Sequence, residues 1–204
     1  LKIKILSRRS LNKYQEKQPF VCKLETFFHK KVDLAIGNSN AVAKELLIEG
    51  IEPRKVLTIR NGTEVIERVR SPNRKSIREF SQIPDNSLLI INVANVIQYK
   101  GHEDIIQAFA ILQKQINYSM FLVFLGFEHK YAARMRELSV ELNIADNIIW
   151  LGQKENIYQY LLSSDIGILA SHEEGFSNAL LEKMMCGLPV VATSVGGNVD
   201  AIAC

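Results

Sequence analysis

Two glutamates separated by seven residues stand out as side chains that could do chemistry. Glu174 lies in a short loop, and Glu182 falls about one turn inside the helix predicted to follow that loop. Because helical side chains lean toward the N-terminus of their helix, Glu182 can reach the same crevice as Glu174. A carboxylate accepts two hydrogen bonds, which suits the vicinal hydroxyls of a sugar.

The start of the same helix offers a place for phosphate. Gly175 loosens the loop, and Ser177 or Asn178 can cap the helix. A helix start carries N–H groups without intrahelical partners and a partial positive charge. Phosphate at a helix start with carboxylates beside it describes a nucleotide-sugar. On these residues alone, the alternative is a solvated loop with two surface glutamates.

The elements around this segment predict an α/β fold. Near-continuous apolar strands separated by helices of about 10–15 residues indicate a parallel sheet covered on both faces. The glutamate segment follows one of these strands, at the carboxyl end where open α/β sheets bind ligands. The expected strands are Leu88–Val96, Met120–Gly126, Ile148–Gly152, Ile166–Ala170 and Pro189–Thr193, and the expected helices are His102–Gln115, Tyr131–Asn143, Ile157–Ser164 and Asn178–Cys186.

The first third of the chain predicts a second, incomplete α/β domain. We expect a helix over Ser39–Glu49, capped by Ser39 or Asn40. The expected strands are Lys2–Leu6, Leu34–Gly37 and Val56–Ile59. The polar stretch 67–86 reads as a linker with a short helix around Arg74–Gln82. The expected domains are therefore 1–66, the C-terminal part of one domain, and 87–204, a domain truncated at its C-terminus.

Composition and charge limit the class of protein. The 204 residues carry a net charge of +3 with scattered basic residues, which argues against a nucleic-acid partner. Three cysteines, Cys22, Cys186 and Cys204, have no metal-site spacing, and their odd number argues against a disulfide framework. No apolar run approaches the roughly 18 residues of a membrane span. We expect a reducing, cytoplasmic setting and no metal.

Several further motifs, in their order and spacing, resemble glycosyltransferase family 4. They are Glu174-Gly175-Phe176, the spacing to Glu182, Cys186 to Thr193, Gly196-Gly197-Asn198, Gly37-Asn38-Ser39, Lys55-Val56, Ile59 to Gly62, Lys100-Gly101 and Ser164-Asp165-Ile166. The resemblance covers nearly the whole chain. It implies a GT-B fold, with part of an N-terminal Rossmann-like domain and most of a C-terminal one that binds the donor. It also implies transfer of a sugar, with retention, from a nucleoside diphosphate sugar to an acceptor hydroxyl.

The resemblance further implies a role for each matched residue. Glu174 would contact the donor hexose near the reacting centre, and Glu182 would contact the ribose hydroxyls. Lys100 would neutralise the leaving diphosphate as its charge grows. The other donor-binding residues it implies are Gly175, Phe176, Ser177, Asn178 and Ala179 at the diphosphate and sugar, and Gln153 and Lys154 at the base.

One position departs from the family pattern. Many members carry an arginine five residues before the lysine, where this chain has Asn95. Either another cation substitutes, or the diphosphate is held less tightly, or the activity of the protein is impaired. Arg8, Arg9 and Arg60 are candidate substitutes, with surface or structural roles as the alternative. An inactive glycosyltransferase-like protein that binds a nucleotide-sugar is therefore the second hypothesis.

The same resemblance implies partners for the protein, and the motifs also bear on two rival functions. By resemblance, the protein needs no cofactor or divalent ion, takes a glycan or lipid-linked sugar as acceptor, and allows peripheral contact with the inner face of a membrane. We expect the reaction to belong to the synthesis of a polysaccharide or glycolipid. An oxidoreductase is disfavoured because no G-x-G-x-x-G follows the first strand of the second domain. The two-glutamate spacing disfavours an epimerase that acts on UDP-sugars.

The chain starts at Leu1 and stops just after a helix should have begun, so we expect a piece of a longer protein that is inactive alone. The remaining expectations concern side chains outside the motifs. We expect His172 to have a surface role at a strand end, His29, His102 and His129 to be solvated, and Met184 and Met185 to pack against the sheet.

Overall fold

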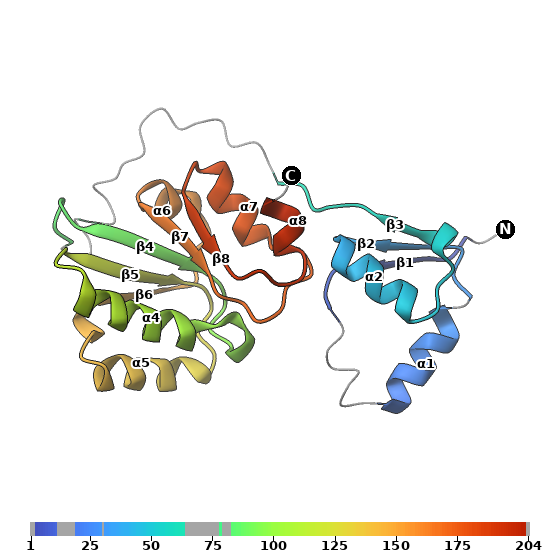
Figure 1. The fold of residues 1–204 in the computed structure, drawn as a ribbon, viewed down its shortest axis with the longest axis horizontal. Coiled ribbons are helices and arrows are strands. Elements are labelled where there is room, and N and C mark those ends of the chain that lie inside the picture. Colours follow the sequence, from blue (N-terminus) through green and yellow to red (C-terminus); the bar gives the residue numbers. More distant parts are fainter. Residues whose placement is uncertain (1–2, 12–18, 30, 64–77, 79–82, 203–204) are drawn as a thin grey trace. The chain divides into compact units, whose positions relative to one another are not determined.

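The computed structural model describes residues 3–11, 19–29, 31–63, 78 and 83–202. The chain divides into two compact units (Figure 1). Unit 1 comprises Leu1–Gly62, Glu173–Asn178 and Ser194–Cys204, and unit 2 comprises Thr63–His172 and Ala179–Thr193. Most of the expected linker and its short helix lie outside the described residues, so the domain boundaries stay a prediction.

Unit 1 contains a parallel sheet in the order β1-β2-β3. Its elements are β1 (Ile5–Arg8), α1 (Pro19–His29), β2 (Leu34–Gly37), α2 (Asn40–Ile48), a 3-10 turn (Pro53–Lys55), β3 (Val56–Thr58) and α8 (Asn198–Ile202). The Ser39 hydroxyl accepts the N–H of Val42 at 3.1 Å, which confirms Ser39 as the cap of α2. Buried Ala35, Val42, Leu46 and Ile51 form its small core.

Two expectations for unit 1 were wrong, and one helix was not anticipated. The first strand begins at Ile5 instead of Lys2, because its pairing with β2 starts at Ile5 opposite Leu34. Helix α1 was not anticipated. His29 is buried instead of solvated, with its ring nitrogen 2.9 Å from a carboxylate oxygen of Glu49. The same carboxylate pairs with Arg8 at 2.7 Å, so Arg8 has a structural role.

Unit 2 contains a five-stranded parallel sheet in the order β6-β5-β4-β7-β8, which confirms the predicted parallel α/β sheet. Its strands are β4 (Leu88–Val93), β5 (Met120–Leu125), β6 (Ile148–Gly152), β7 (Ile166–Leu169) and β8 (Val190–Ala192). Its α-helices are α4 (His102–Gln115), α5 (Tyr131–Glu141), α6 (Tyr158–Leu162) and α7 (Asn178–Met185). The first residue of α7, Asn178, is assigned to unit 1, and the rest of the helix belongs to unit 2.

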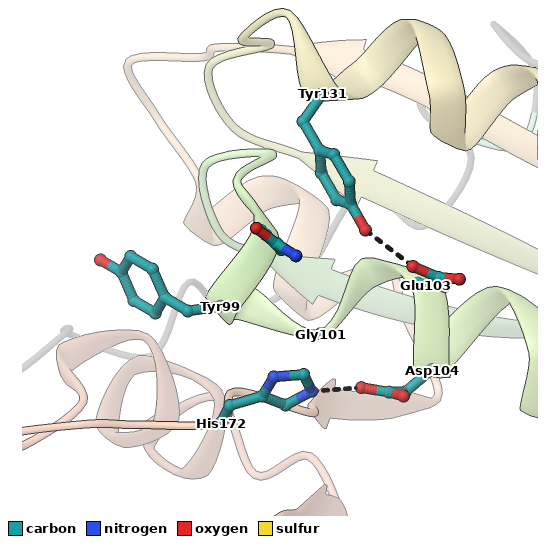
Figure 2. A pocket seen from close by; sticks show the side chains of 7 residues that line it. Tyr99, Gly101, Glu103, Asp104, Tyr131 and His172 are labelled. Carbon is teal, nitrogen blue, oxygen red and sulfur yellow. Dashed lines mark hydrogen bonds and ion pairs between the residues drawn. The ribbon is translucent and has the colours of Figure 1, made fainter. Parts of the chain in front are cut away.

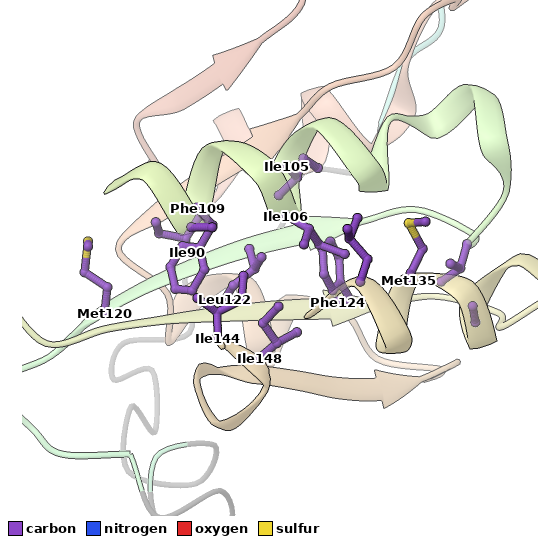
Figure 3. Packing of buried hydrophobic residues seen from close by; sticks show 14 residues of the cluster. Ile90, Ile105, Ile106, Phe109, Met120, Leu122, Phe124, Met135, Ile144 and Ile148 are labelled. Carbon is purple, nitrogen blue, oxygen red and sulfur yellow. The ribbon is translucent and has the colours of Figure 1, made fainter. Parts of the chain in front are cut away.

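Both faces of the central strands are buried, as the continuous apolar pattern predicts. Ile90 belongs to the core beneath α4 and α5, where Phe109 and Met135 meet the sheet (Figure 3). Leu89 and Ile91, which alternate with Ile90, belong to a second core on the other face. The sheet is therefore the rigid middle layer that positions the loops at its edge.

The strand order places a topological switch point between β4 and β7. The chain first adds β5 and β6 on one side of β4 and then adds β7 and β8 on the other. Open α/β sheets bind ligands outside the carboxyl ends of the strands at this point. The two segments that follow these strands carry Lys100 and Glu174.

Candidate functional site

The turn after β4 contains Lys100 and Gly101. Gly101 has a φ of +68°, and a Cβ atom there would lie 1.9 Å from the carbonyl oxygen of Ala170, just beyond β7. The N–H of His172 donates to the carbonyl of Tyr99 at 2.8 Å. The backbones that leave β4 and β7 are thus in direct contact, and only a glycine allows this approach. Lys100 is half-buried beside them.

The loop that carries Glu174 packs against two glycines of the C-terminal segment. A Cβ atom on Gly196 would lie 1.9 Å from the carbonyl oxygen of Glu174, and one on Gly197 would lie 2.0 Å from that of Gly175. The N–H of Gly197 also donates to the Glu174 carbonyl at 3.1 Å. These contacts give the Gly196-Gly197 motif a physical role, since they fix the backbone that leads into α7. Glu174 itself is buried, with 9% of its surface exposed.

Helix α7 begins directly after this loop. Phe176 and Ser177 are buried, Asn178 is exposed and Ala179 is half-buried. The capping role expected of Ser177 or Asn178 stays a prediction. Glu182 is half-buried, and burial raises the pKa of its carboxyl group, while the charge of neighbouring Lys183 acts in the opposite direction. The convergence of Glu174 and Glu182 on one crevice also stays a prediction.

Sequence reasoning missed Lys183, which is completely buried on the inner face of α7. Met184 and Met185, which we expected to pack against the sheet, are exposed at 38% and 37%. Lys183 and Leu180 instead take the inward positions, which are three residues apart on one helix face. The signal that could have revealed this is Gly167 in β7, which leaves room for the lysine chain.

The two residues expected at the base follow β6. Gln153 and Lys154 are both exposed, directly after Gly152, whose φ of +65° ends the strand. Their position is open to a ligand at the carboxyl edge of the sheet. Contact with a base stays a prediction.

Asn95 has a structural task in the turn after β4. Its side-chain oxygen accepts the N–H of Phe127 at 3.1 Å, so it links the turns that follow β4 and β5. The side chain is exposed and carries no charge. Arg9 and Arg60, two of the candidate substitutes, are exposed in unit 1.

His102, which we expected to be solvated, is completely buried at the start of α4. Its Nε2 atom lies 3.3 Å from the side-chain nitrogen of Asn92, and its ring lies 5.0 Å from that of Phe124. Burial, helped by the charge of Lys100 and opposed by a hydrogen bond to Ala94, lowers the pKa of His102 to about 4. The ring is therefore neutral at physiological pH and belongs to the packing beneath the turn.

A hollow of about 290 Å³ lies beside the same turn, but it does not suit a diphosphate. It is lined by Gln98, Tyr99, Gly101, Glu103, Asp104, Tyr131 and His172, and thus by none of the side chains assigned above to the donor (Figure 2). Its two carboxylates already have partners, as Figure 2 shows. The Tyr131 hydroxyl donates to Glu103 at 3.0 Å, and His172 contacts Asp104 at 2.6 Å.

Burial, together with the Glu103 carboxylate, raises the pKa of Tyr131 to about 12. The phenol therefore stays protonated and remains a donor to that carboxylate. His172, half exposed, has the surface role expected of it. Among the described residues, no set of three or more His, Cys, Asp and Glu side chains is arranged to hold a metal ion. The described helices also include none with the length and apolar character of a membrane span.

The architecture matches a fold that is already known from solved structures. The structure of Anabaena Alr3699/HepE in complex with UDP-glucose superimposes with a TM-score of 0.85, covering 96% of this chain and 54% of that one at 20% identity. Solved structures with this likeness share the GT-B fold, which confirms the expected fold class.

The chain belongs to the family of glycosyl transferases group 1, whose model matches residues 73–203. It is 32% identical over 120 residues to N-acetyl-alpha-D-glucosaminyl L-malate synthase of Bacillus anthracis, covering 59% of this chain and 31% of the relative. It is 29% identical over 171 residues to N-acetylgalactosamine-N,N'-diacetylbacillosaminyl-diphospho-undecaprenol 4-alpha-N-acetylgalactosaminyltransferase of Campylobacter jejuni, covering 83% of this chain and 44% of the relative. The chain thus spans less than half the length of these two relatives.

Proposed function

We propose that the chain is the donor-binding part of a retaining glycosyltransferase. The enzyme moves a sugar from a nucleoside diphosphate sugar to an acceptor hydroxyl in the synthesis of a polysaccharide or glycolipid. The observation that carries the proposal is the position of α7, which starts after the Glu174 loop beyond strand β7 of the switch point. Family membership supports the reaction class, and the HepE complex with UDP-glucose supports the donor class.

The diphosphate binds at the start of α7. The first N–H groups of a helix have no intrahelical acceptor, and the helix dipole favours negative charge there. The N–H groups of Ser177, Asn178 and Ala179 supply these contacts. The buried loop backbone ahead of them is held by Gly196 and Gly197, so the donors are positioned before the ligand arrives.

Lys100 provides positive charge opposite the leaving group. It lies at the end of the turn after β4, and the contact between Gly101 and Ala170 fixes this turn against the end of β7. As the bond between sugar and phosphate breaks, negative charge grows on the phosphate oxygens. A lysine held beside them stabilises the transition state more than the ground state.

The two glutamates bind hydroxyl groups. Glu182 is half-buried on α7 and accepts hydrogen bonds from the ribose, while Glu174 does so from the transferred sugar. Burial disfavours the ionised form of Glu182, as the raised pKa indicates, so hydroxyl donors that stabilise the carboxylate are favoured partners. Gln153 and Lys154 lie at the base.

The bonding changes then balance without a protein base. The bond between the anomeric carbon and the phosphate oxygen breaks, and the electron pair leaves with the nucleoside diphosphate. The acceptor oxygen attacks from the same face and forms the new bond to the anomeric carbon, which retains the configuration. The acceptor proton passes to the departing phosphate oxygen.

Turnover of a donor panel tests the proposal. UDP, GDP and ADP sugars are incubated with the purified full-length protein that contains this chain and with candidate acceptors, with and without EDTA, and products are analysed by mass spectrometry and NMR. We expect one donor series to bind and react in EDTA, with the anomeric configuration retained. Glu174→Gln should lower turnover about 100-fold or more, since removal of one transition-state contact has costs of this order. The matched control Glu155→Gln removes the same charge from an exposed residue and should retain activity.

A metal requirement, an inverted product or unchanged turnover in Glu174→Gln contradicts the proposal. The second candidate is an inactive nucleotide-sugar-binding protein. Asn95 favours it, because its side chain is neutral and bonded to Phe127 in the place where a second cation would assist the leaving group. Tight donor binding with no transfer to any acceptor and no donor hydrolysis would support this candidate.

A further inference from the structure

Lys183 is a fully buried lysine at the centre of α7's inner face. Its aliphatic chain crosses β7 at Gly167, where an added Cβ atom would lie 2.6 Å from the lysine Cδ. Its Nζ atom donates to the main-chain carbonyl of Ala179 at 3.3 Å. The stem thus lies under the helix, and the amino group lies at the helix's first turn.

This arrangement is costly for a residue whose only task is packing. Lysine is almost never fully buried, and removing its amino group from water costs free energy unless partners compensate for it. A leucine at this position would fill the inner face as Leu180 does, with a side chain that needs no polar partner. Gly167 must also stay small to accommodate the lysine, so the lysine restricts the residue type at a second position.

The amino group of Lys183 lies at the first turn of α7, where a positive charge would attract an anion bound at the helix start. Helical side chains lean toward the helix N-terminus, and Lys183 does so, reaching the carbonyl four residues earlier. Ala179 is the second residue of α7 and belongs to the first turn, whose N–H groups have no intrahelical acceptor. A charge beneath this turn adds to the positive end of the helix dipole.

We propose that Lys183 is a positioning residue that supplies fixed positive charge beneath the first turn of α7 and strengthens its hold on a diphosphate. It acts through the helix and does not touch the ligand. The inference rests on the proposed function, since it assumes that the diphosphate binds at this turn. Lys183 would then make α7 bind a nucleoside diphosphate more tightly than a nucleoside monophosphate, which carries less negative charge.

The test compares ligands that differ only in phosphate. Uridine, UMP and UDP, and the guanosine and adenosine series, are titrated into wild-type protein and Lys183→Met by calorimetry. Methionine keeps the length and apolar stem of lysine without its charge. Over several ångströms, at an effective dielectric constant of about 20, a unit charge changes affinity for an anion by about 10-fold or more. We expect this loss for the diphosphate, a smaller loss for the monophosphate and none for the nucleoside.

Two further variants separate charge from packing. Lys183→Gln keeps a hydrogen-bond donor without charge and should lose the same preference for diphosphate. Lys44→Met removes a lysine from the exposed side of α2 and should bind every ligand as the wild type does. The melting temperature of each variant is measured to check that it is folded.

Each outcome decides a separate question. If the wild type binds no nucleoside diphosphate, the proposed function fails. If it does bind one, and Lys183→Met keeps the wild-type ratio of diphosphate to nucleoside affinity, Lys183 has only a packing role and the inference fails. Full preference in Lys183→Gln would likewise overturn the role of charge, because the hydrogen bond alone would then suffice.

Discussion

Substitution of Gly101 by alanine should destabilise unit 2 far more than the same change at Gly187. Both glycines have left-handed backbone, with φ of +68° and +74°. At Gly187 an added Cβ atom would meet nothing within 4 Å, whereas at Gly101 it would lie 1.9 Å from the carbonyl oxygen of Ala170. The pair therefore separates backbone strain from the contact between the two turns of the switch point.

The magnitudes follow from these two terms. Left-handed backbone costs a residue with a Cβ atom about 1–2 kcal/mol, and we expect this for Gly187→Ala. Gly101→Ala bears the same cost and must also push two backbone segments apart, which adds about 1–3 kcal/mol or more. The total of about 2–5 kcal/mol is a large part of the stability of a typical domain.

Urea unfolding measured by tryptophan fluorescence can resolve this difference. Trp150, the single tryptophan, lies in β6, so its emission reports on unit 2. Gly152→Ala, with a φ of +65° and no neighbour within 4 Å, is a second control that should behave like Gly187→Ala. Equal losses of unfolding free energy in Gly101→Ala and both controls would refute the close approach of the turns after β4 and β7.

Two further predictions concern Glu182 and His102. Glu182→Ala should weaken nucleotide binding about 10-fold or more, because a hydrogen bond to a charged group contributes about 1.5–3 kcal/mol; unchanged affinity in calorimetry would remove Glu182 from the site. The pKa of His102 is lowered to about 4 from 6.5, so the unfolded state binds more protons between these values, and the free energy of unfolding should fall as pH drops through this range. The full loss is about 3 kcal/mol, and urea titrations at about pH 7 and pH 5 should show a smaller acid loss in His102→Gln than in wild type, whereas parallel losses would contradict a buried neutral ring.

The elements of unit 2 could be predicted from the sequence because their apolar runs are continuous. Strand β4 is buried on both faces, so its pattern needs no knowledge of its neighbours. The first strand of unit 1 was harder to place, because Ile3 and Ile5 are both exposed and apolar pattern alone does not fix its ends. Pairing with β2 sets them instead, and pairing is not a local property of the sequence.

The missed helix α1 did carry a signal, since Phe20, Leu24 and Phe27 follow helical spacing. These side chains are exposed at 79%, 49% and 54%, so they do not contribute to the core cluster of unit 1. Their spacing would have located the helix even though burial did not drive it.

The candidate site was likewise predictable only in part. Motif spacing singled out the Glu174 loop and the turn at Lys100 as candidates, because such motifs depend on the order of residues along the chain. It did not reveal that Lys183 is buried, because the space for its stem comes from Gly167 in another element. His102, which lies outside the motifs, was expected in solvent, although Phe124 of the neighbouring strand packs against its ring.

A crystal structure of the protein with the nucleoside diphosphate that it binds most tightly is the most direct test. The proposed function predicts the pyrophosphate on the main-chain N–H groups at the start of α7, the ribose at Glu182, and the Lys100 ammonium within about 4 Å of a phosphate oxygen. A nucleotide that lies elsewhere, with the first turn of α7 untouched, would contradict it.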